Sequence, residues 1–215
     1  MSDRILLPAL KSRVGDWVYY VCSLTFQNVE RLIKSPDEIH RSRKLSEWIQ
    51  REAIEKHSGE ISDYILGNDQ RFLGAVIVGV YDGDPNWAPI EVNYNTPDIE
   101  ATEDQRDEIS GKVGVLSFSG EEKLFAIDGQ HRVAGIKKAL AESENRNELG
   151  LENICAIFVG HDESSEQGRL RTRRLFTTVN KKAKAVSTAA TIALDEDNGF
   201  AIVTRRLVDE FGLFS

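Results

Sequence analysis

The sequence contains few cysteines, and their placement argues against a metal site. It has 2, Cys22 and Cys155, and neither lies near a histidine or another cysteine at the spacing of a zinc ligand set. Both stand in apolar, strand-like runs of the sequence. We therefore expect two buried free thiols in a reducing compartment, rather than a disulfide or a zinc site.

Long hydrophobic runs are also missing. No run approaches the roughly 20 apolar residues that a membrane-spanning helix needs. The short apolar patch near the N-terminus is broken by Pro8 and does not resemble a signal peptide. We therefore expect a soluble cytoplasmic protein without membrane contact. Because the sequence stops in or just after an amphipathic segment, we also expect the natural chain to continue beyond Ser215.

The chain lacks an excess of positive charge, since its formal net charge is −8. The molecule as a whole therefore does not attract nucleic acid, and any such contact must use a local basic patch. With 215 residues, of which 40% are hydrophobic, the chain is long enough to bury a substantial core.

What is present is an alternation of strand-like and helix-like patterns. Expected strands lie at 16–27, 72–83, 113–119, 123–128 and 153–160, and the segment SGEE is expected to join the third and fourth as a hairpin. Expected helices or helical turns lie at 28–33, 37–57 (ended by Gly59), 63–66, 131–143, about 164–180, 187–194 and 200–211. These patterns predict an α/β (α+β) fold with a small mixed sheet of four to five strands and a helical C-terminal section.

The expected domain organisation follows from changes in composition. Residues 1–163 form the α/β core, and residues 164–215 form a basic helical extension packed on it. Within the core, residues 84–111 contain three of the 5 prolines and then an acidic stretch. Such a composition is typical of an exposed, loop-like excursion.

The stretch DGQHR, residues 128–132, stands between the expected strand at 123–128 and the expected helix at 131–143. Gly129 permits a positive φ or a close approach of the backbone. Gln130, His131 and Arg132 open the helix, where unpaired N–H groups and the helix dipole favour an anion. Arg132 adds a planar fork that matches phosphate oxygens, and His131 can donate to a phosphate or transfer a proton.

Asp128 has the wrong charge for direct phosphate contact. It is suited to hold Arg132 or His131, to bind a Mg²⁺ that bridges phosphates, or to orient a water molecule. Each residue of the stretch is also common at an ordinary helix start, where Asp is a frequent N-cap. Two successive potential cations after an apolar strand, however, favour a bound counter-anion.

The segment LFAIDGQHRVAGIKKA resembles the signature of the DGQHR-domain family. The best-known members of that family resemble the B component of DNA phosphorothioate (Dnd) modification and restriction systems, and the family is similar to the ParB/sulfiredoxin-like fold. In those relatives a Gly-x-x-Arg or Gly-x-His-Arg turn at the head of a helix grips nucleotide phosphates. Gly129, His131 and Arg132 match that turn. Gln130 replaces the catalytic cysteine of sulfiredoxin, so thiol repair chemistry is not expected.

A second candidate segment is basic. Residues 169–184, RLRTRRLFTTVNKKAK, hold seven Lys or Arg and no acid. On a helix, an apolar side would pack on the core and leave the cations outward, which fits a patch that follows phosphates. The alternative is a solvated helix face. The predicted phosphate and DNA contacts are Arg169, Arg171, Arg173, Arg174, Asn180, Lys181 and Lys182, and the segment 173–187 resembles a downstream Asn-containing segment of the family.

The resemblance implies a nucleotide-binding protein that acts in a bacterial or archaeal DNA modification, restriction or defence system with other components. We expect it to bind a nucleoside triphosphate, ATP or CTP, with Mg²⁺. Gly129, Gln130, His131 and Arg132 would bind the nucleotide, Asp128 would hold the metal, and Asp128 and His131 would be the catalytic pair. Hydrolysis, where it occurs, should be slow because no group that activates a nucleophile is evident.

Three alternatives remain open at this stage. The protein is a non-enzymatic, DNA-binding transcriptional regulator, for which the basic segment would suffice. It is a metal-dependent DNA nickase, in which Asp128 and His131 bind a metal that activates water. Or it is a structural subunit whose turn at 128–132 binds a partner's carboxylate.

Overall fold

The computed structural model describes residues 4–34, 54–91, 102–160 and 199–210. The chain divides into two compact units, Met1–Phe176 and Thr177–Ser215. In the second unit the described residues form α10 (Gly199–Glu210), which confirms the helix predicted at 200–211. The helices predicted between 164 and 194 lie outside the described residues, and the packing of the basic extension on the core stays a prediction.

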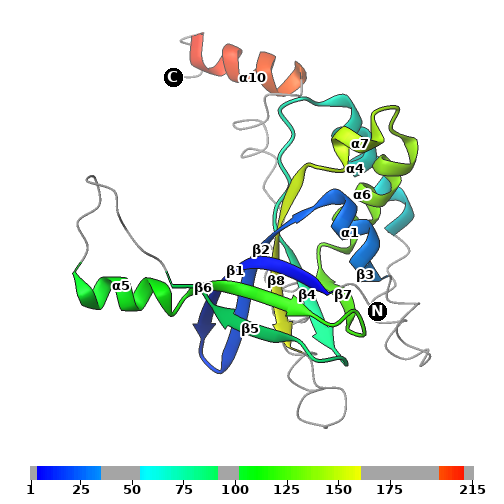
Figure 1. The fold of residues 1–215 in the computed structure, drawn as a ribbon. Coiled ribbons are helices and arrows are strands. Elements are labelled where there is room, and N and C mark those ends of the chain that lie inside the picture. The colour runs from blue at the N-terminus through cyan, green and yellow to red at the C-terminus, as the bar shows by residue number, and fades with distance from the viewer. Residues whose placement is uncertain (1–3, 35–53, 92–101, 161–198, 211–215) are drawn as a thin grey trace. The chain divides into compact units, whose positions relative to one another are not determined.

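The first unit is built on an open, mixed sheet with strand order β3-β7-β4-β8-β2-β1-β6-β5 (Figure 1). Its strands are β1 (Ile5–Val14), β2 (Trp17–Thr25), β3 (Ile33–Lys34), β4 (Val76–Tyr81), β5 (Asn86–Pro89), β6 (Val113–Phe118), β7 (Lys123–Asp128) and β8 (Asn153–Gly160). The β3–β7 and β4–β8 pairs are parallel, and the other pairs are antiparallel. The predicted α/β class is confirmed, but the predicted strand number is wrong, because the sheet has 8 strands.

The strands that the sequence did not predict are β1, β3 and β5. β1 was obscured by Pro8, a residue that interior strand positions rarely tolerate. The pairing of β1 with β2 begins one residue later, at Ala9, so at Pro8 the strand pairs only with β6. A missing N–H group is tolerated where a strand has a neighbour on one side only. β3 and β5 have 2 and 4 residues and are too short for a periodic pattern.

The predicted hairpin between β6 and β7 is wrong. β6 pairs with β1 and β5, whereas β7 pairs with β3 and β4, so the chain crosses from one part of the sheet to another between them. Glu122 organises this crossing. Its Oε1 accepts hydrogen bonds from the N–H and Oγ of Ser119, each 2.9 Å long, and from the N–H of Asp84 at 3.0 Å, while Oε2 accepts from the N–H of Gly120 at 2.9 Å.

The Glu122 carboxylate should make stability depend on pH. Desolvation raises the pKa of Glu122, but the hydrogen bonds from Ser119 and Gly120 outweigh it, and the net result is a lowered pKa. A carboxyl group with a lowered folded pKa stabilises the protein at neutral pH and loses that contribution as the pH falls through the acidic range. We expect Glu122→Gln to lower the free energy of unfolding by about 1 kcal/mol at pH 7.

Urea denaturation of both proteins at pH 7 and pH 3 measures this effect. The difference in free energy of unfolding between wild type and Glu122→Gln should shrink at pH 3, because a larger fraction of the wild-type carboxylate is then protonated. Glu121→Gln makes the same charge change at an exposed neighbouring position and serves as the control. If wild type and Glu122→Gln differ in free energy of unfolding by the same amount at both pH values, the stabilising role assigned to the ionised Glu122 carboxylate is contradicted.

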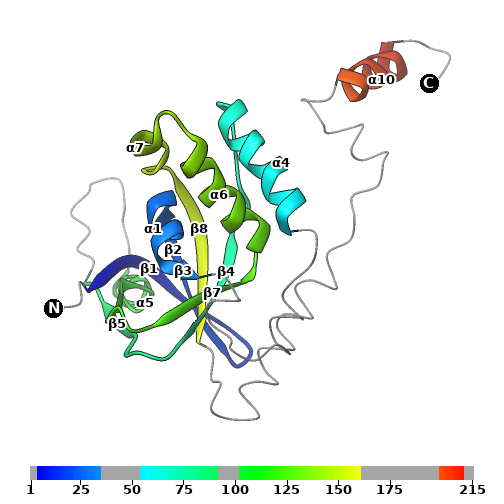
Figure 2. The ribbon, with the colours of Figure 1, turned by 90° about the vertical axis from the view of Figure 1, so that its right-hand side faces the viewer.

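The helices of the first unit are α1 (Phe26–Leu32), α4 (Ile54–Gly67), α5 (Glu103–Ser110), α6 (Gln130–Glu142) and α7 (Arg146–Leu149). Figure 2 shows α1, α6 and α4 side by side over the sheet. The core lies between these helices and the sheet, and its fully buried members include Leu24, Val78, Ile136 and Phe158. Within the described parts of the chain, no helix is long and apolar enough to cross a membrane.

The predicted end of a helix at Gly59 is wrong. α4 begins at Ile54, passes through Gly59 and ends at Gly67, and it includes the separately predicted turn at 63–66. A glycine costs a helix about 1 kcal/mol, which packing against a neighbouring helix can offset. Here α4 packs closely on α6, since a Cβ atom at Gly135 would stand 2.4 Å from Cγ2 of Ile61. Residues 37–53 of the predicted helix lie outside the described residues.

The described residues of the predicted excursion, 84–91 and 102–111, are mostly exposed, as predicted, but they are more regular than expected. It contains β5 and also α5, which has no buried residue and stands clear of the other helices in Figure 1. Thr102 and Gln105 form a capping box at the start of α5, in which each side chain accepts from the backbone N–H of the other residue. This local signal, rather than burial, accounts for the helix.

The two cysteines differ in burial, which corrects the expectation that both are buried. Cys22 is 3% exposed, whereas Cys155 is exposed, and both are free thiols. The alternation of side chains along β8 explains the difference, because Ile154 and Ala156 face the core and Cys155 therefore faces away. Burial, with a smaller contribution from Cys155, raises the pKa of the Cys22 thiol to about 12.

The native protein should therefore react with a thiol reagent at one cysteine only. At pH 8 about one in 10⁴ of the Cys22 side chains would be thiolate, and burial blocks the reagent as well. We expect labelling with a chromogenic disulfide to consume one thiol rapidly in the native protein and two after unfolding. Cys155→Ser should abolish the rapid phase and Cys22→Ser should leave it unchanged. Rapid reaction of both thiols in the native protein would contradict this arrangement.

Candidate functional site

The turn between β7 and α6 leaves the start of the helix open. β7 ends at Asp128, α6 begins at Gln130, and Gly129 between them has φ 81° and ψ 23°, in the left-handed region that favours glycine. Gly129 itself has no side chain that could cap the helix, and the N–H of Val133 donates to the Gly129 carbonyl at 2.9 Å. The first N–H groups of α6 are therefore not satisfied by a capping side chain, and they carry the positive end of the helix dipole.

Arg132 is held beside this helix start in a defined position. Its Nη2 donates to Oδ2 of Asp128 at 2.9 Å, and the two side chains are 29% and 30% exposed. A Cβ atom built on Gly129 would stand 2.9 Å from the Arg132 Nε, and one built on Gly74 would stand 3.2 Å from Nη1. The guanidinium group thus lies against two glycines, where a larger residue would collide with it.

The surroundings of Arg132 leave its guanidinium group able to accept a further partner. In the described part of the chain its Nε is buried without a hydrogen-bond partner, while the guanidinium as a whole keeps some exposure. Within the described parts of the chain, the carboxylate of Asp128 offsets its charge. The turn also lies against β4, because a Cβ atom at Gly129 would stand 2.8 Å from Cγ1 of Val76. A phosphate at this turn would therefore share Arg132 with Asp128 or replace it as the partner.

The other residues of the stretch are placed differently. The side-chain Nε2 of Gln130 donates to the Ala126 carbonyl at 3.2 Å, so this side chain folds back on β7. The nucleotide-binding role predicted for Gln130 consequently rests on its backbone N–H group. His131 is half-buried in the first turn of α6. Its predicted roles in binding and catalysis stay predictions.

The predicted metal role of Asp128 has limited support. The described residues contain no group of three or more His, Cys, Asp or Glu side chains that could hold a metal ion. One oxygen of Asp128 already accepts from Arg132. A Mg²⁺ ion fits here only if phosphate oxygens and water supply most of its ligands, as they do in many nucleotide sites.

The predicted basic patch cannot be compared with this geometry. Its residues lie outside the described residues, namely Arg169, Arg171, Arg173, Arg174, Asn180, Lys181 and Lys182.

Sequence reasoning missed the contribution of the segment before β4. Gly74 lies against the Arg132 guanidinium although the two residues are far apart in sequence. A glycine near the start of an otherwise apolar strand often marks a close approach of another group. The sequence FLGAVIVGV contains such a glycine at Gly74, but only the fold shows that the approaching group is the Arg132 guanidinium.

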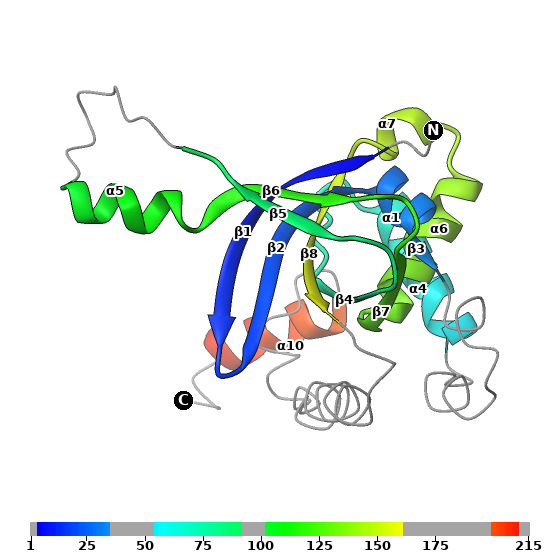
Figure 3. The ribbon, with the colours of Figure 1, turned by 60° about the horizontal axis from the view of Figure 1, so that its bottom comes forward.

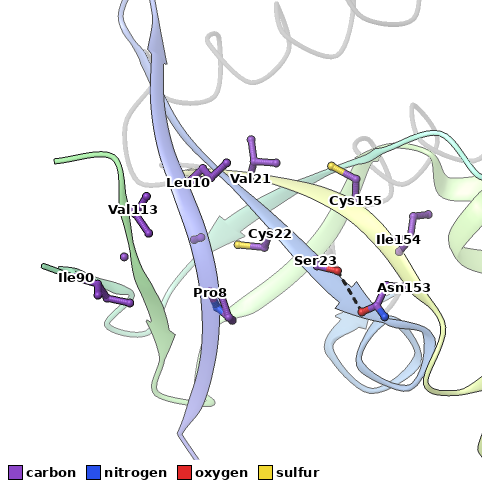
Figure 4. Close-up of a pocket in the computed structure, with 12 residues that line it drawn as sticks. Pro8, Leu10, Val21, Cys22, Ser23, Ile90, Val113, Asn153, Ile154 and Cys155 are labelled. Atoms are coloured by element: carbon purple, nitrogen blue, oxygen red, sulfur yellow. Dashed lines mark hydrogen bonds between the residues drawn. The ribbon is translucent and has the colours of Figure 1, made fainter. Parts of the chain in front are cut away.

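A separate pocket, of about 450 Å³, lies over β1, β2, β6 and β8 (Figure 4). Its lining is mostly apolar and includes Leu10, Val21 and Ile90. The polar side chains of Ser23 and Asn153 in it bond each other at 3.1 Å. Among the described residues, no lysine, arginine, aspartate or glutamate lines it, so this lining does not favour an anion and differs in chemistry from the turn at 128–132.

Comparison with known protein families gives a match over most of the chain. A family model described as DndB, DNA-sulfur modification-associated, matches residues 7–215. No curated protein and no solved structure matches the chain. The matched range includes the turn at 128–132, the segment before β4 and the basic segment at 169–184.

Proposed function

Because the chain belongs to the DndB family of DNA-sulfur modification-associated proteins, we propose that it binds the phosphates of a nucleoside triphosphate at the start of α6. Membership of this family supports a role in DNA phosphorothioate modification, within a system that has further components. ATP or CTP with Mg²⁺ is the proposed ligand. The bound nucleotide would serve the modification, the restriction or the regulation of DNA.

The observation that carries the proposal is the placement of Arg132 beside an uncapped helix start. An anion at this point gains hydrogen bonds from backbone N–H groups and the favourable field of the helix dipole. The guanidinium is positioned in advance by Asp128, Gly74 and Gly129. A group that is already ordered loses little conformational freedom when the ligand binds, which strengthens binding.

The residues of the stretch then have distinct proposed roles. Gly129 leaves room for the guanidinium and orients the first N–H groups of α6, Arg132 binds phosphate oxygens, and Asp128 positions Arg132. His131 donates to a phosphate oxygen or transfers a proton. When bound, Mg²⁺ would neutralise phosphate charge, and hydrolysis at this site would depend on positioning and charge neutralisation.

A second candidate function is that of a DNA-binding regulator without enzymatic activity. The seven Lys or Arg and no acid within residues 169–184 favour it, because such a segment binds DNA phosphates in the absence of nucleotide. Its affinity for duplex DNA should fall steeply with salt whether or not nucleotide is present. A requirement for ATP or CTP in DNA binding would instead favour the nucleotide proposal.

Titration calorimetry of the full chain with ATP, CTP and GTP in the presence of Mg²⁺ tests the proposed function. A saturable heat with one or more of these nucleotides is the expected result. Negligible heat with all three would overturn the proposal.

A further inference from the structure

The segment that leads into β4 presents an aromatic ring to solvent. Phe72 is 84% exposed, although its neighbours are anchored. Arg71 forms an ion pair with Glu152, the N–H of Phe72 donates to the Tyr64 hydroxyl at 3.0 Å, and Leu73 packs against the core. The exposure of the ring is therefore a property of an ordered backbone and not of an unattached loop.

The same segment places this ring on the side of the phosphate-binding arginine. Exposure alternates along it, since Arg71 and Leu73 are half-buried while Phe72 and Gly74 are exposed. Such alternation puts residues two apart on one side of an extended chain, about 7 Å apart. The Arg132 guanidinium lies where a side chain of Gly74 would stand, with Nη1 3.2 Å from that Cβ position. On this alternation, we expect Phe72 to stand on the side of the segment that the Arg132 guanidinium contacts at Gly74.

We propose that Phe72 is a stacking platform for the base of the nucleotide whose phosphates Arg132 binds. A flat aromatic ring beside a cation offers the two surfaces that a nucleotide needs, one for the base and one for the phosphates. Because every base has an aromatic face, stacking on Phe72 contributes affinity with little base preference. This inference rests on the proposed function, since it requires phosphate binding at the start of α6.

The test compares ATP with inorganic triphosphate, which has the same phosphates and no base, by calorimetry on the full chain with Mg²⁺. We expect Phe72→Ala to weaken ATP binding about 10-fold and to leave triphosphate binding unchanged. Phe72→Trp, which keeps an aromatic ring, should retain ATP binding, and Phe72→Leu, which keeps an apolar side chain without a ring, should not. The exposed position means that none of these variants should change the melting temperature.

A second set of measurements asks whether the base that stacks on Phe72 belongs to a free nucleotide or to DNA. If it comes from DNA, Phe72→Ala should weaken binding of a single-stranded oligonucleotide and leave binding of an abasic strand of equal length unchanged. Equal binding of ATP and of the oligonucleotide by Phe72→Ala and wild type would overturn the stacking role and spare the proposed function, provided that triphosphate still binds. If wild type binds neither ATP nor triphosphate nor either strand, both proposals fail.

Discussion

Replacing Arg132 with alanine is expected to weaken binding of ATP or CTP about 100-fold, which corresponds to about 2.7 kcal/mol. The guanidinium offers charge-assisted hydrogen bonds to phosphate oxygens, and it is already held between Asp128 and the two glycines. Arg132→Lys keeps the charge but loses the planar fork, so it should weaken binding by a smaller factor. Titration calorimetry with Mg²⁺ and each nucleotide measures the change.

A matched control comes from the other end of α6. Arg146 of α7 is also partly exposed and paired with one carboxylate, Glu30, at 2.7 Å. Arg146→Ala makes the same change in net charge, and we expect it to leave nucleotide binding unchanged. A loss in both variants would point to a general charge effect, and unchanged binding by Arg132→Ala would refute the phosphate site.

Arg132→Ala also leaves Asp128 without its partner, and that negative charge would repel a phosphate. The double variant Asp128→Ala, Arg132→Ala separates the two causes. If Arg132 itself binds phosphate, the double variant should remain weak. Recovery of affinity would mean that the single variant failed because of the uncovered carboxylate.

The largest expected loss of stability follows from Phe158→Ala. Phe158 lies on β8, between β4 and β2, and is 1% exposed. Its ring centroid is 5.4 Å from that of Phe118 on β6. Figure 3 shows the two strands, β8 and β6, that this ring contact connects. Removing a buried phenyl group costs about 3–5 kcal/mol, because the transfer free energy is lost and a cavity remains. That is a large part of the roughly 5–15 kcal/mol that stabilises a typical domain.

Phe72→Ala is the matched control, because the same atoms are removed from a side chain that is 84% exposed. Urea denaturation monitored by circular dichroism should show a much lower midpoint for Phe158→Ala and a midpoint near that of wild type for Phe72→Ala. Similar losses in the two variants would contradict the burial assigned to these rings.

Much of the fold could be predicted where a pattern is local and long. The strands that became β2, β4, β6, β7 and β8 each carry several apolar or β-branched residues in succession, and all five were predicted. The helix α6 was predicted within one residue at each end, because its apolar positions recur at helical spacing and a turn precedes it. β3 and β5 were not predicted, since short strands form through pairing with neighbours rather than through a pattern of their own.

Pairing partners could not be predicted at all. The segment between β6 and β7 has the length of a hairpin turn, yet Glu122 ties it to Asp84 and the two strands pair elsewhere. Which strands pair depends on contacts between residues distant in sequence, and a local pattern contains no information about them. The same limit applies to the exposure of Cys155, which was set by the side of the sheet that the helices cover.

By itself the sequence determined that a glycine would open a helix after an apolar strand, with an acid and an arginine beside it. That much follows from local backbone geometry and from the short reach between Asp128 and Arg132. Only the tertiary structure decided that Gly74 makes room for the Arg132 guanidinium and that Phe72, two residues before Gly74, stands exposed on an anchored segment. These relations depend on where β4 pairs in the sheet, and the burial of the whole core fixes that pairing.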